Sequence, residues 1–355
     1  MSERLRVAAE RDAAFRIPRD TAPTPPSRLY LSLTERCNLR CEHCITRAPE
    51  RTASGEGRHL GEAVLDALTP HLADLEYVAF THAGEPTFAP LLEETLTRLQ
   101  AARAGRPTVV HMLTNGLALG PRRFEALAGL GLRSLSFSID GMRAASHDRL
   151  RVGSSVQDLL TRITELARRR AEGGLDVRMG LACTLTRANL EDLPALVDFA
   201  AATGLDWVKL EELVSVNAVA EALLPEPSAL AAALNGARAR AEAAGLPLVD
   251  HATHAGHERC DPDPEAQVFL RGDDLVNRVA LNRCRAPFEV ICVDANGDVH
   301  PVDFTYPVAG NLLDEPLEAL WNGPIFRRIR GDRLMERPCR TGPTTCPPDP
   351  GPEGW

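Results

Sequence analysis

Three cysteines lie in one short stretch of the chain, Cys37-Asn38-Leu39-Arg40-Cys41-Glu42-His43-Cys44. Soft thiolates at such close spacing select zinc or an iron–sulfur cluster. A structural zinc site is normally closed by four ligands, and His43 is the obvious fourth ligand. It stands between two of the cysteines, however, where a short loop leaves it little freedom to turn back onto the same metal. The stretch therefore favours a cluster with one coordination position left for another molecule.

The cysteine stretch directly follows an apolar run at residues 29–33, which reads as a buried strand. Further strand-like runs recur roughly every 25–50 residues, and the stretches between them carry apolar residues at helical spacing. This alternation is typical of a parallel sheet, either a partial barrel or a doubly wound sheet, and periodicity alone does not separate the two. We expect six strands, at residues 29–33, 77–81, 108–113, 134–139, 177–184 and 207–213.

The size and charge of the chain limit its class. Its 355 residues suffice for one barrel and an appended domain, and the net charge of −9 is not gathered in blocks. Residues 1–19 lack the apolar core of a signal peptide, and no stretch reaches the ~18 apolar residues that cross a bilayer. We expect a cytoplasmic protein with no nucleic-acid or membrane partner. Its nine cysteines are not expected to form disulfides; those clustered at residues 37–44 and 260–346 favour metal binding, with burial as small apolar residues as the alternative for some.

The composition changes near residue 251. A helix is expected at residues 227–244, ending at Gly245. Beyond it the chain is rich in Pro, Gly, Asp and Cys, with short strand signals at residues 288–293 and 298–300 around a turn at 294–297. We expect an N-terminal lead-in at residues 1–27, a barrel at 28–250 and a small loop-rich domain at 251–355 that needs bound metal to be stable.

The Cys-x3-Cys-x2-Cys pattern at the end of a first strand resembles the radical S-adenosylmethionine (SAM) superfamily. The resemblance implies an α/β fold with an incomplete, TIM-like (β/α)6 barrel, which favours the barrel over the doubly wound sheet. It also implies a [4Fe-4S] cluster held by Cys37, Cys41 and Cys44, with SAM chelated to the fourth iron. An external one-electron donor such as flavodoxin or ferredoxin would reduce this cluster.

Four later segments fit the SAM-binding segments of that family. The stretch Thr81–Pro86 is similar to the family's Gly-Gly-Glu-Pro motif, with Ala83 in place of the first glycine. The resemblance implies that this motif contacts the SAM amino group, and that small polar groups at later strand ends lie near SAM. Each residue has a turn, cap or surface role as its alternative. The expected contacts are Ala83, Gly84, Glu85 and Pro86; Asn115; Ser138 and Asp140 for the ribose hydroxyls; and Arg151 for the SAM carboxylate.

The C-terminal segments beginning at Cys284 and at Gly297 resemble the SPASM or twitch extension of radical SAM enzymes, which carries auxiliary [4Fe-4S] clusters. Val302 departs from the pattern, because a cysteine usually stands there. The thiols left suffice for one four-cysteine cluster but not for two. We expect one auxiliary cluster, with a degenerate extension lacking a cluster as the alternative. Its ligands would be Cys284, Cys339 and Cys346, with Cys260 or Cys292 as the fourth.

Further residues are candidates for the reaction itself. Asp303 resembles the aspartate of a Cys-Asp-Phe run in anaerobic sulfatase-maturating enzymes, which implies a general base; its alternative is a turn residue. Cys183 is either a hydrogen-atom donor or a small buried residue. Lys209 and Glu211 share one face of the sixth strand and are either substrate contacts or an ion pair at the rim.

From these residues we expect oxidation of a secondary alcohol on a small polar molecule, such as an aminocyclitol or sugar, in antibiotic or other natural-product biosynthesis. One alternative is maturation of a ribosomally made peptide, although few residues precede the first strand for a leader-binding domain. A second is a sugar epimerase, and a third is a non-enzymatic, zinc-stabilised binding protein that uses His43.

Overall fold

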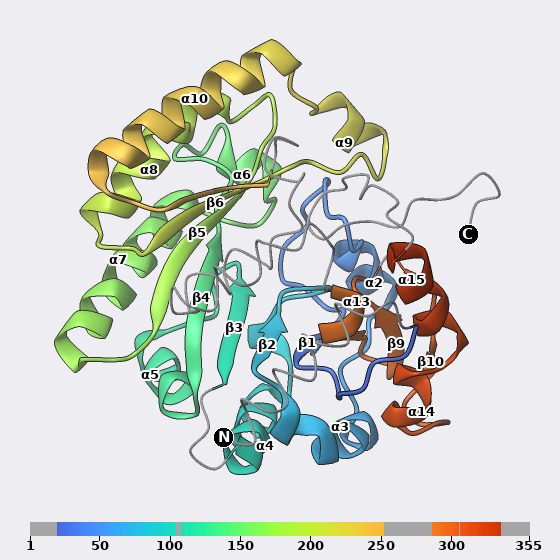
Figure 1. The fold of residues 1–355 in the computed structure, drawn as a ribbon. Coiled ribbons are helices and arrows are strands. Elements are labelled where there is room, and N and C mark those ends of the chain that lie inside the picture. The colour runs from blue at the N-terminus through green and yellow to red at the C-terminus, as the bar shows by residue number, and fades with distance from the viewer. Residues whose placement is uncertain (1–19, 104–107, 252–285, 305, 335–355) are drawn as a thin grey trace.

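The computed structural model describes residues 20–103, 108–251, 286–304 and 306–334, which are coloured in Figure 1. Within this part of the chain, no helix is long and apolar enough to cross a membrane. The described strands form a single ten-stranded sheet, which curves into an open, barrel-like wall.

The sheet has the order β10-β9-β8-β1-β2-β3-β4-β5-β6-β7, so that β10 and β7 lie at its two edges. All neighbours from β8 to β7 pair in parallel, whereas β8, β9 and β10 pair antiparallel. The strands are β1 Arg28–Leu31, β2 Tyr77–Phe80, β3 Val109–Thr114, β4 Leu132–Ser138, β5 Arg178–Thr184, β6 Trp207–Glu211, β7 Leu248–Asp250, β8 Val290–Val293, β9 Asp298–Pro301 and β10 Gly310–Asn311.

The six strands expected from the sequence are confirmed as β1 to β6, in parallel and in chain order, and the predicted partial barrel is correct. The short strand β7 was not expected. The strands β8 and β9 were expected, but they do not form a sheet of their own. Because β8 pairs with β1 in parallel, the C-terminal strands extend the barrel sheet. The domain division at residue 250 stays a prediction, because residues 252–285 lie outside the described part.

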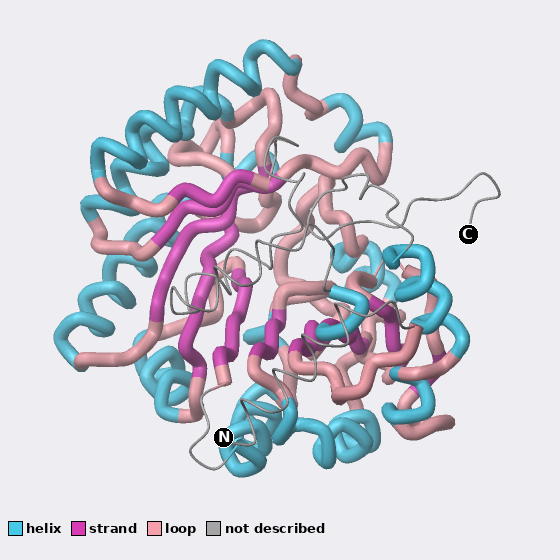
Figure 2. Tube along the Cα trace, viewed as in Figure 1, coloured by secondary structure: helices cyan, strands magenta, loops and turns pink. Residues whose placement is uncertain are grey.

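Helices cover the outer side of the sheet (Figure 2). Three short 3-10 turns accompany them, η1 Thr69–Asp74, η2 Pro86–Phe88 and η3 Leu190–Asp192. The helix expected at residues 227–244 is confirmed as α10, which ends at Gly245 with φ 65°. The helices are α2 Ala48–Ser54, α3 Glu62–Leu68, α4 Leu92–Arg103, α5 Pro121–Gly129, α6 His147–Leu150, α7 Val156–Gly173, α8 Leu193–Ala202, α9 Ala218–Ala222, α10 Pro227–Ala244, α13 Ala286–Glu289, α14 Leu317–Trp321 and α15 Pro324–Leu334.

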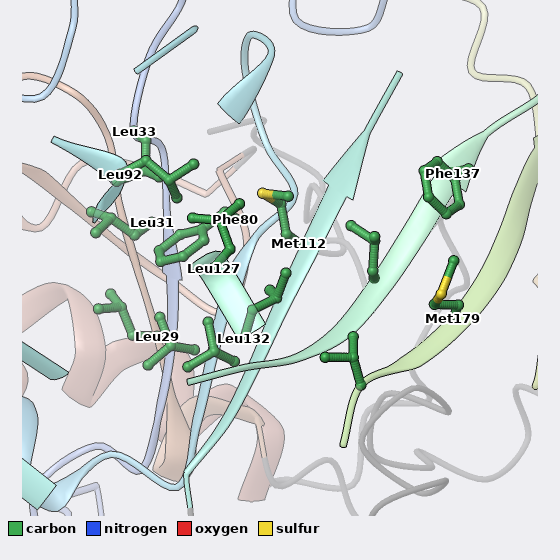
Figure 3. Close-up of a cluster of buried hydrophobic side chains, with 14 of the residues drawn as sticks. Leu29, Leu31, Leu33, Phe80, Leu92, Met112, Leu127, Leu132, Phe137 and Met179 are labelled. Atoms are coloured by element: carbon green, nitrogen blue, oxygen red, sulfur yellow. The ribbon is translucent and has the colours of Figure 1, made fainter. Parts of the chain in front are cut away.

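The two faces of the sheet differ in chemistry. Side chains alternate along each strand, and the residues that face the helices are apolar and join one large buried core (Figure 3). Leu29 and Leu31 of β1, Phe80 of β2 and Phe137 of β4 belong to this core. The alternate residues face the interior of the barrel and are mostly polar or aromatic, among them Tyr30, Tyr77, His111, Ser134, Ser136, Trp207, Lys209 and Glu211. The interior is therefore the face that can bind a polar ligand.

Candidate functional site

The cysteine stretch forms a loop directly after β1, and its three cysteines are free and partly buried. Burial raises the pKa of Cys37, and it raises the pKa of Cys41 to about 12. Nitrogen donors approach the Cys37 sulfur, with Leu39 N at 3.4 Å and Asn115 Nδ2 at 3.9 Å. Thr46 Oγ1 lies 3.3 Å from the Cys44 sulfur. Hydrogen bonds to sulfur are a means by which proteins tune a bound cluster.

These residues fit a [4Fe-4S] cluster better than a single ion. Within the described residues, no three His, Cys, Asp or Glu side chains converge on one metal position. A cubane cluster does not need such convergence, because each thiolate binds a different iron. The closed zinc site with His43 is not what the structure shows, since His43 Nε2 lies 3.3 Å from Asp140 Oδ2 instead. The three thiols would hold the cluster.

The segment that follows β2 lies against the cysteine loop. Gly84 N donates to Thr34 O at 2.7 Å, and Glu85 N donates to Arg36 O at 2.8 Å. A Cβ atom on Gly84 would lie 2.0 Å from Arg36 O, so only glycine allows this close approach. The two segments therefore position each other, and residues 83–86 lie beside the cysteines as expected for a SAM-binding motif.

Ala83 adopts a left-handed backbone conformation with φ 74°, which explains why glycine is suited to this position. We expect Ala83→Gly to raise the free energy of unfolding by about 0.5–1 kcal/mol, because relief of the left-handed strain outweighs the extra entropy of glycine in the unfolded chain. The shift of the urea midpoint under anaerobic conditions measures this change. Ala232→Gly, at an exposed site within α10, should instead cost about 1 kcal/mol. A loss of stability in both variants would contradict the prediction.

Glu85 is buried, and its carboxylate joins the segment after β2 to the end of β3. One oxygen accepts from Thr87 N, Thr87 Oγ1 and Thr114 Oγ1, the last at 2.6 Å. The other accepts from Asn115 N at 2.7 Å. Burial raises the pKa of Glu85, although these hydrogen bonds oppose the shift. Asn115 Nδ2 in turn donates to Asn38 Oδ1 at 2.7 Å, so the end of β3 is bound to the cysteine loop.

Asp140 follows β4 and is completely buried. Arg151 Nε lies 2.6 Å from Oδ2 and Arg151 Nη2 lies 3.1 Å from Oδ1, while Thr184 N donates to Oδ1 at 2.9 Å. Burial opposes ionisation, but Arg151 and His43 hold the pKa of Asp140 below its usual range. This arrangement differs from the expected ribose contact, because both carboxylate oxygens face protein groups. Ser138 is also buried, and its contact with the ribose stays a prediction. The contact of Arg151 with the SAM carboxylate stays a prediction as well.

A second polar group surrounds Asp303. The rings of His82 and Phe304 stack with centroids 3.9 Å apart and an interplanar angle of 7°. Burial lowers the pKa of His82 to about 4, although Asp303 opposes the shift. Cys292 is buried in β8, opposite His300 of β9, and its pKa is raised by burial and then by Asp303. The segment that follows β2 therefore lies against the C-terminal segment around Asp303.

Val302, which stands where the extension usually has a cysteine, adopts φ 66° and is buried against Tyr306 and Ile329. A left-handed conformation is strained for a β-branched residue. The remaining cysteines expected to bind an auxiliary cluster lie outside the described residues, namely Cys260, Cys284, Cys339 and Cys346.

Lys209 and Glu211 form an ion pair of 2.7 Å in the barrel interior, and their contact with a substrate stays a prediction. His251 Nδ1 lies 3.1 Å from Glu211 Oε2. Burial opposes ionisation of Glu211, but Lys209 and His251 lower its pKa to about 2. Cys183 faces the helices and is fully buried in the apolar core. Its position therefore matches the small buried residue and not the hydrogen-atom donor.

Sequence reasoning missed several residues of the site. Thr46 donates to Ala83 O at 2.8 Å and so joins the cysteine loop to the SAM motif. His82 stands directly before Ala83, and this adjacency was the one available signal for it. His251 gave no local signal, because its partner Glu211 is 40 residues away in the chain.

Comparison with known families identifies the class of protein. Residues 31–200 match the radical SAM superfamily, and residues 284–347 match the iron–sulfur cluster-binding SPASM domain. Together with the open barrel and its three-cysteine loop, these matches show that the chain belongs to the radical SAM superfamily and carries a C-terminal SPASM domain. Its cofactors are accordingly a [4Fe-4S] cluster with SAM and auxiliary iron–sulfur chemistry in the SPASM domain. That there is one auxiliary cluster stays a prediction.

Individual relatives have low sequence identity to this chain, but the similarity extends over most of its length. The chain is 24% identical to pre-heme d1 synthase of Dinoroseobacter shibae, over 86% of this chain and 76% of the relative. It is 25% identical to PqqA peptide cyclase of Gluconobacter oxydans, over 90% of this chain and 84% of the relative. Among solved structures, Streptococcus suis SuiB bound to its precursor peptide SuiA has a TM-score of 0.65 at 16% identity, covering 92% and 71% of the two chains, which supports the fold alone.

Proposed function

We propose that this protein matures a ribosomally made peptide by radical SAM chemistry. The observation that carries the proposal is the similarity to PqqA peptide cyclase, which spans nine-tenths of this chain. Among the described strands, those at the two edges of the sheet, β7 and β10, do not pair with each other.

The cluster and SAM, when bound, supply a 5′-deoxyadenosyl radical that removes a hydrogen atom from a substrate carbon. The chain's own residues would orient the substrate. Lys209 and Glu211 present a cation and an anion on the interior face, and both suit the amides and charged ends of a peptide. Asp303, on the C-terminal segment, would take the proton that the substrate loses on oxidation, and the auxiliary iron–sulfur chemistry of the SPASM domain would accept the electron.

The test asks whether the substrate is destroyed by protease. Anaerobically reconstituted protein is given SAM, a chemical reductant, and the low-mass fraction of source cells, either intact or treated with protease. If the substrate is a peptide, the fraction should stimulate 5′-deoxyadenosine formation, and protease treatment should abolish the stimulation. Mass spectrometry should then find a peptide that has lost hydrogen. A stimulation that survives protease treatment would overturn the proposal.

Asp303→Asn tests the proposed base. We expect the yield of modified peptide to fall by about 100-fold or more, because a positioned general base contributes that much. Formation of 5′-deoxyadenosine should continue, since hydrogen abstraction precedes proton loss. Asp314→Asn, in a turn after β10, removes a carboxylate from the same part of the chain and should leave the yield unchanged. Equal loss of both products in Asp303→Asn would assign Asp303 a structural role.

The oxidation of a small secondary alcohol, which Asp303 suggested from the sequence, is less well supported than peptide maturation. A second candidate is modification of a tetrapyrrole, because pre-heme d1 synthase is similar over 86% of this chain. The protease comparison separates both from a peptide, since neither substrate is a target of proteolysis.

A further inference from the structure

The ion pair of Asp140 and Arg151 joins two residues for which the sequence predicts separate contacts with SAM. Asp140 is fully buried, and the Arg151 side chain is 14% exposed. The guanidinium approaches both carboxylate oxygens, and Thr184 N adds a hydrogen bond from β5. The backbone is held as well, because Asp140 N donates to His147 Nδ1 at 3.1 Å. A pair anchored from several elements keeps its charges in one place.

This pair is packed against the cysteine loop. His43 stands between Cys41 and Cys44, and its Nε2 lies 3.3 Å from Asp140 Oδ2. One residue beyond Arg151, Val152 O accepts from Arg40 N at 2.8 Å. The loop that holds the thiols therefore touches the pair through a side chain and through the backbone.

The two charges act on the thiols in opposite directions. Asp140 touches the loop between Cys41 and Cys44 through His43, and Arg151 is held against Asp140, so a cation and an anion both lie beside the thiols. The Asp140 side chain is fully buried and that of Arg151 is 14% exposed, so that solvent screens their fields weakly. Any change of charge among the thiolates is therefore felt by both members of the pair.

We propose that Asp140 and Arg151 act as positioning residues that set the reduction potential of the cluster held by Cys37, Cys41 and Cys44. Reduction adds one electron, delivered by an external one-electron donor, and makes the cluster more negative by one charge. Arg151 stabilises that reduced form and Asp140 opposes it, so the intact pair holds the potential between two extremes. This inference concerns the cluster and is independent of the substrate class.

The experiment is a redox titration of reconstituted protein, followed by EPR, without SAM or substrate. The signal of the Cys37→Ala/Cys41→Ala/Cys44→Ala protein is subtracted to remove other clusters. Asp140→Asn should shift the potential to a more positive value, because Arg151 is left uncompensated. Arg151→Gln should shift it to a more negative value, and the double variant should return close to the wild-type value.

Arg149→Gln is the matched control, because it removes an exposed arginine of α6, two residues before Arg151, and should not shift the potential. A structural role alone would not give shifts of opposite sign. If the reduction potential shifted in the same direction in Asp140→Asn and Arg151→Gln, the inference would be overturned. It would also be overturned if both variants kept their full iron content and showed no shift. If Asp140→Asn fails to hold the cluster, the comparison of Arg151→Gln with the charge-conserving Arg151→Lys decides. A negative shift of the reduction potential in Arg151→Gln, without one in Arg151→Lys, supports the inference. Equal shifts in the two variants overturn it.

Discussion

Replacing Cys37, Cys41 and Cys44 together by alanine will remove about four irons per chain and abolish the reductive cleavage of SAM. The loss is expected to be complete because each of the three thiolates would bind a different iron of the cluster, and the variant removes all three. Iron and sulfide content after anaerobic reconstitution, together with 5′-deoxyadenosine formation, measures both effects. Wild-type protein with about eight irons would confirm the single auxiliary cluster, and about four would show that it is absent.

Cys183→Ala is the matched control, since it removes a thiol that is buried in the apolar core away from the barrel interior. It should keep the wild-type iron content and SAM cleavage, at a cost in stability of about 1 kcal/mol for the small cavity. Retention of all the iron by the triple variant would contradict the assignment of the cysteine loop as the SAM cluster site.

Gly84→Ala should lower the free energy of unfolding by about 3 kcal/mol and reduce the iron content. The new Cβ would meet Arg36 O at 2.0 Å, and the backbone next to Cys37 would have to move. Two hydrogen bonds hold the segments together, Gly84 N to Thr34 O and Glu85 N to Arg36 O, so the clash cannot be relieved without losing them. Urea unfolding and iron analysis measure the two effects.

The control for this variant is Gly129→Ala, where a Cβ would meet nothing within 4 Å at the end of α5. Alanine there should be neutral or should stabilise the helix by up to about 1 kcal/mol. If Gly84→Ala were as stable as Gly129→Ala and kept its iron, the close approach of the SAM motif to the cysteine loop would be wrong.

Much of the fold could be predicted from local sequence signals. Six strands were expected within a few residues of their observed ends, because each appears as a short run rich in apolar residues between helical stretches. The cysteine loop and the segment at residues 81–86 were also readable, since each is a contiguous motif at the end of a strand. These signals establish a radical SAM protein but not its substrate.

Tertiary structure decided which of the polar residues act together. Asp140 appeared to be free for a ribose, but it is buried against Arg151 and His43, which come from other segments. The pairing of β8 with β1 could not be seen either, since it joins segments about 260 residues apart. Local periodicity records which face of each element is buried, as for Leu29 in β1. Long-range register and the choice of ionic partners depend on the packing of the whole chain, which no single stretch contains.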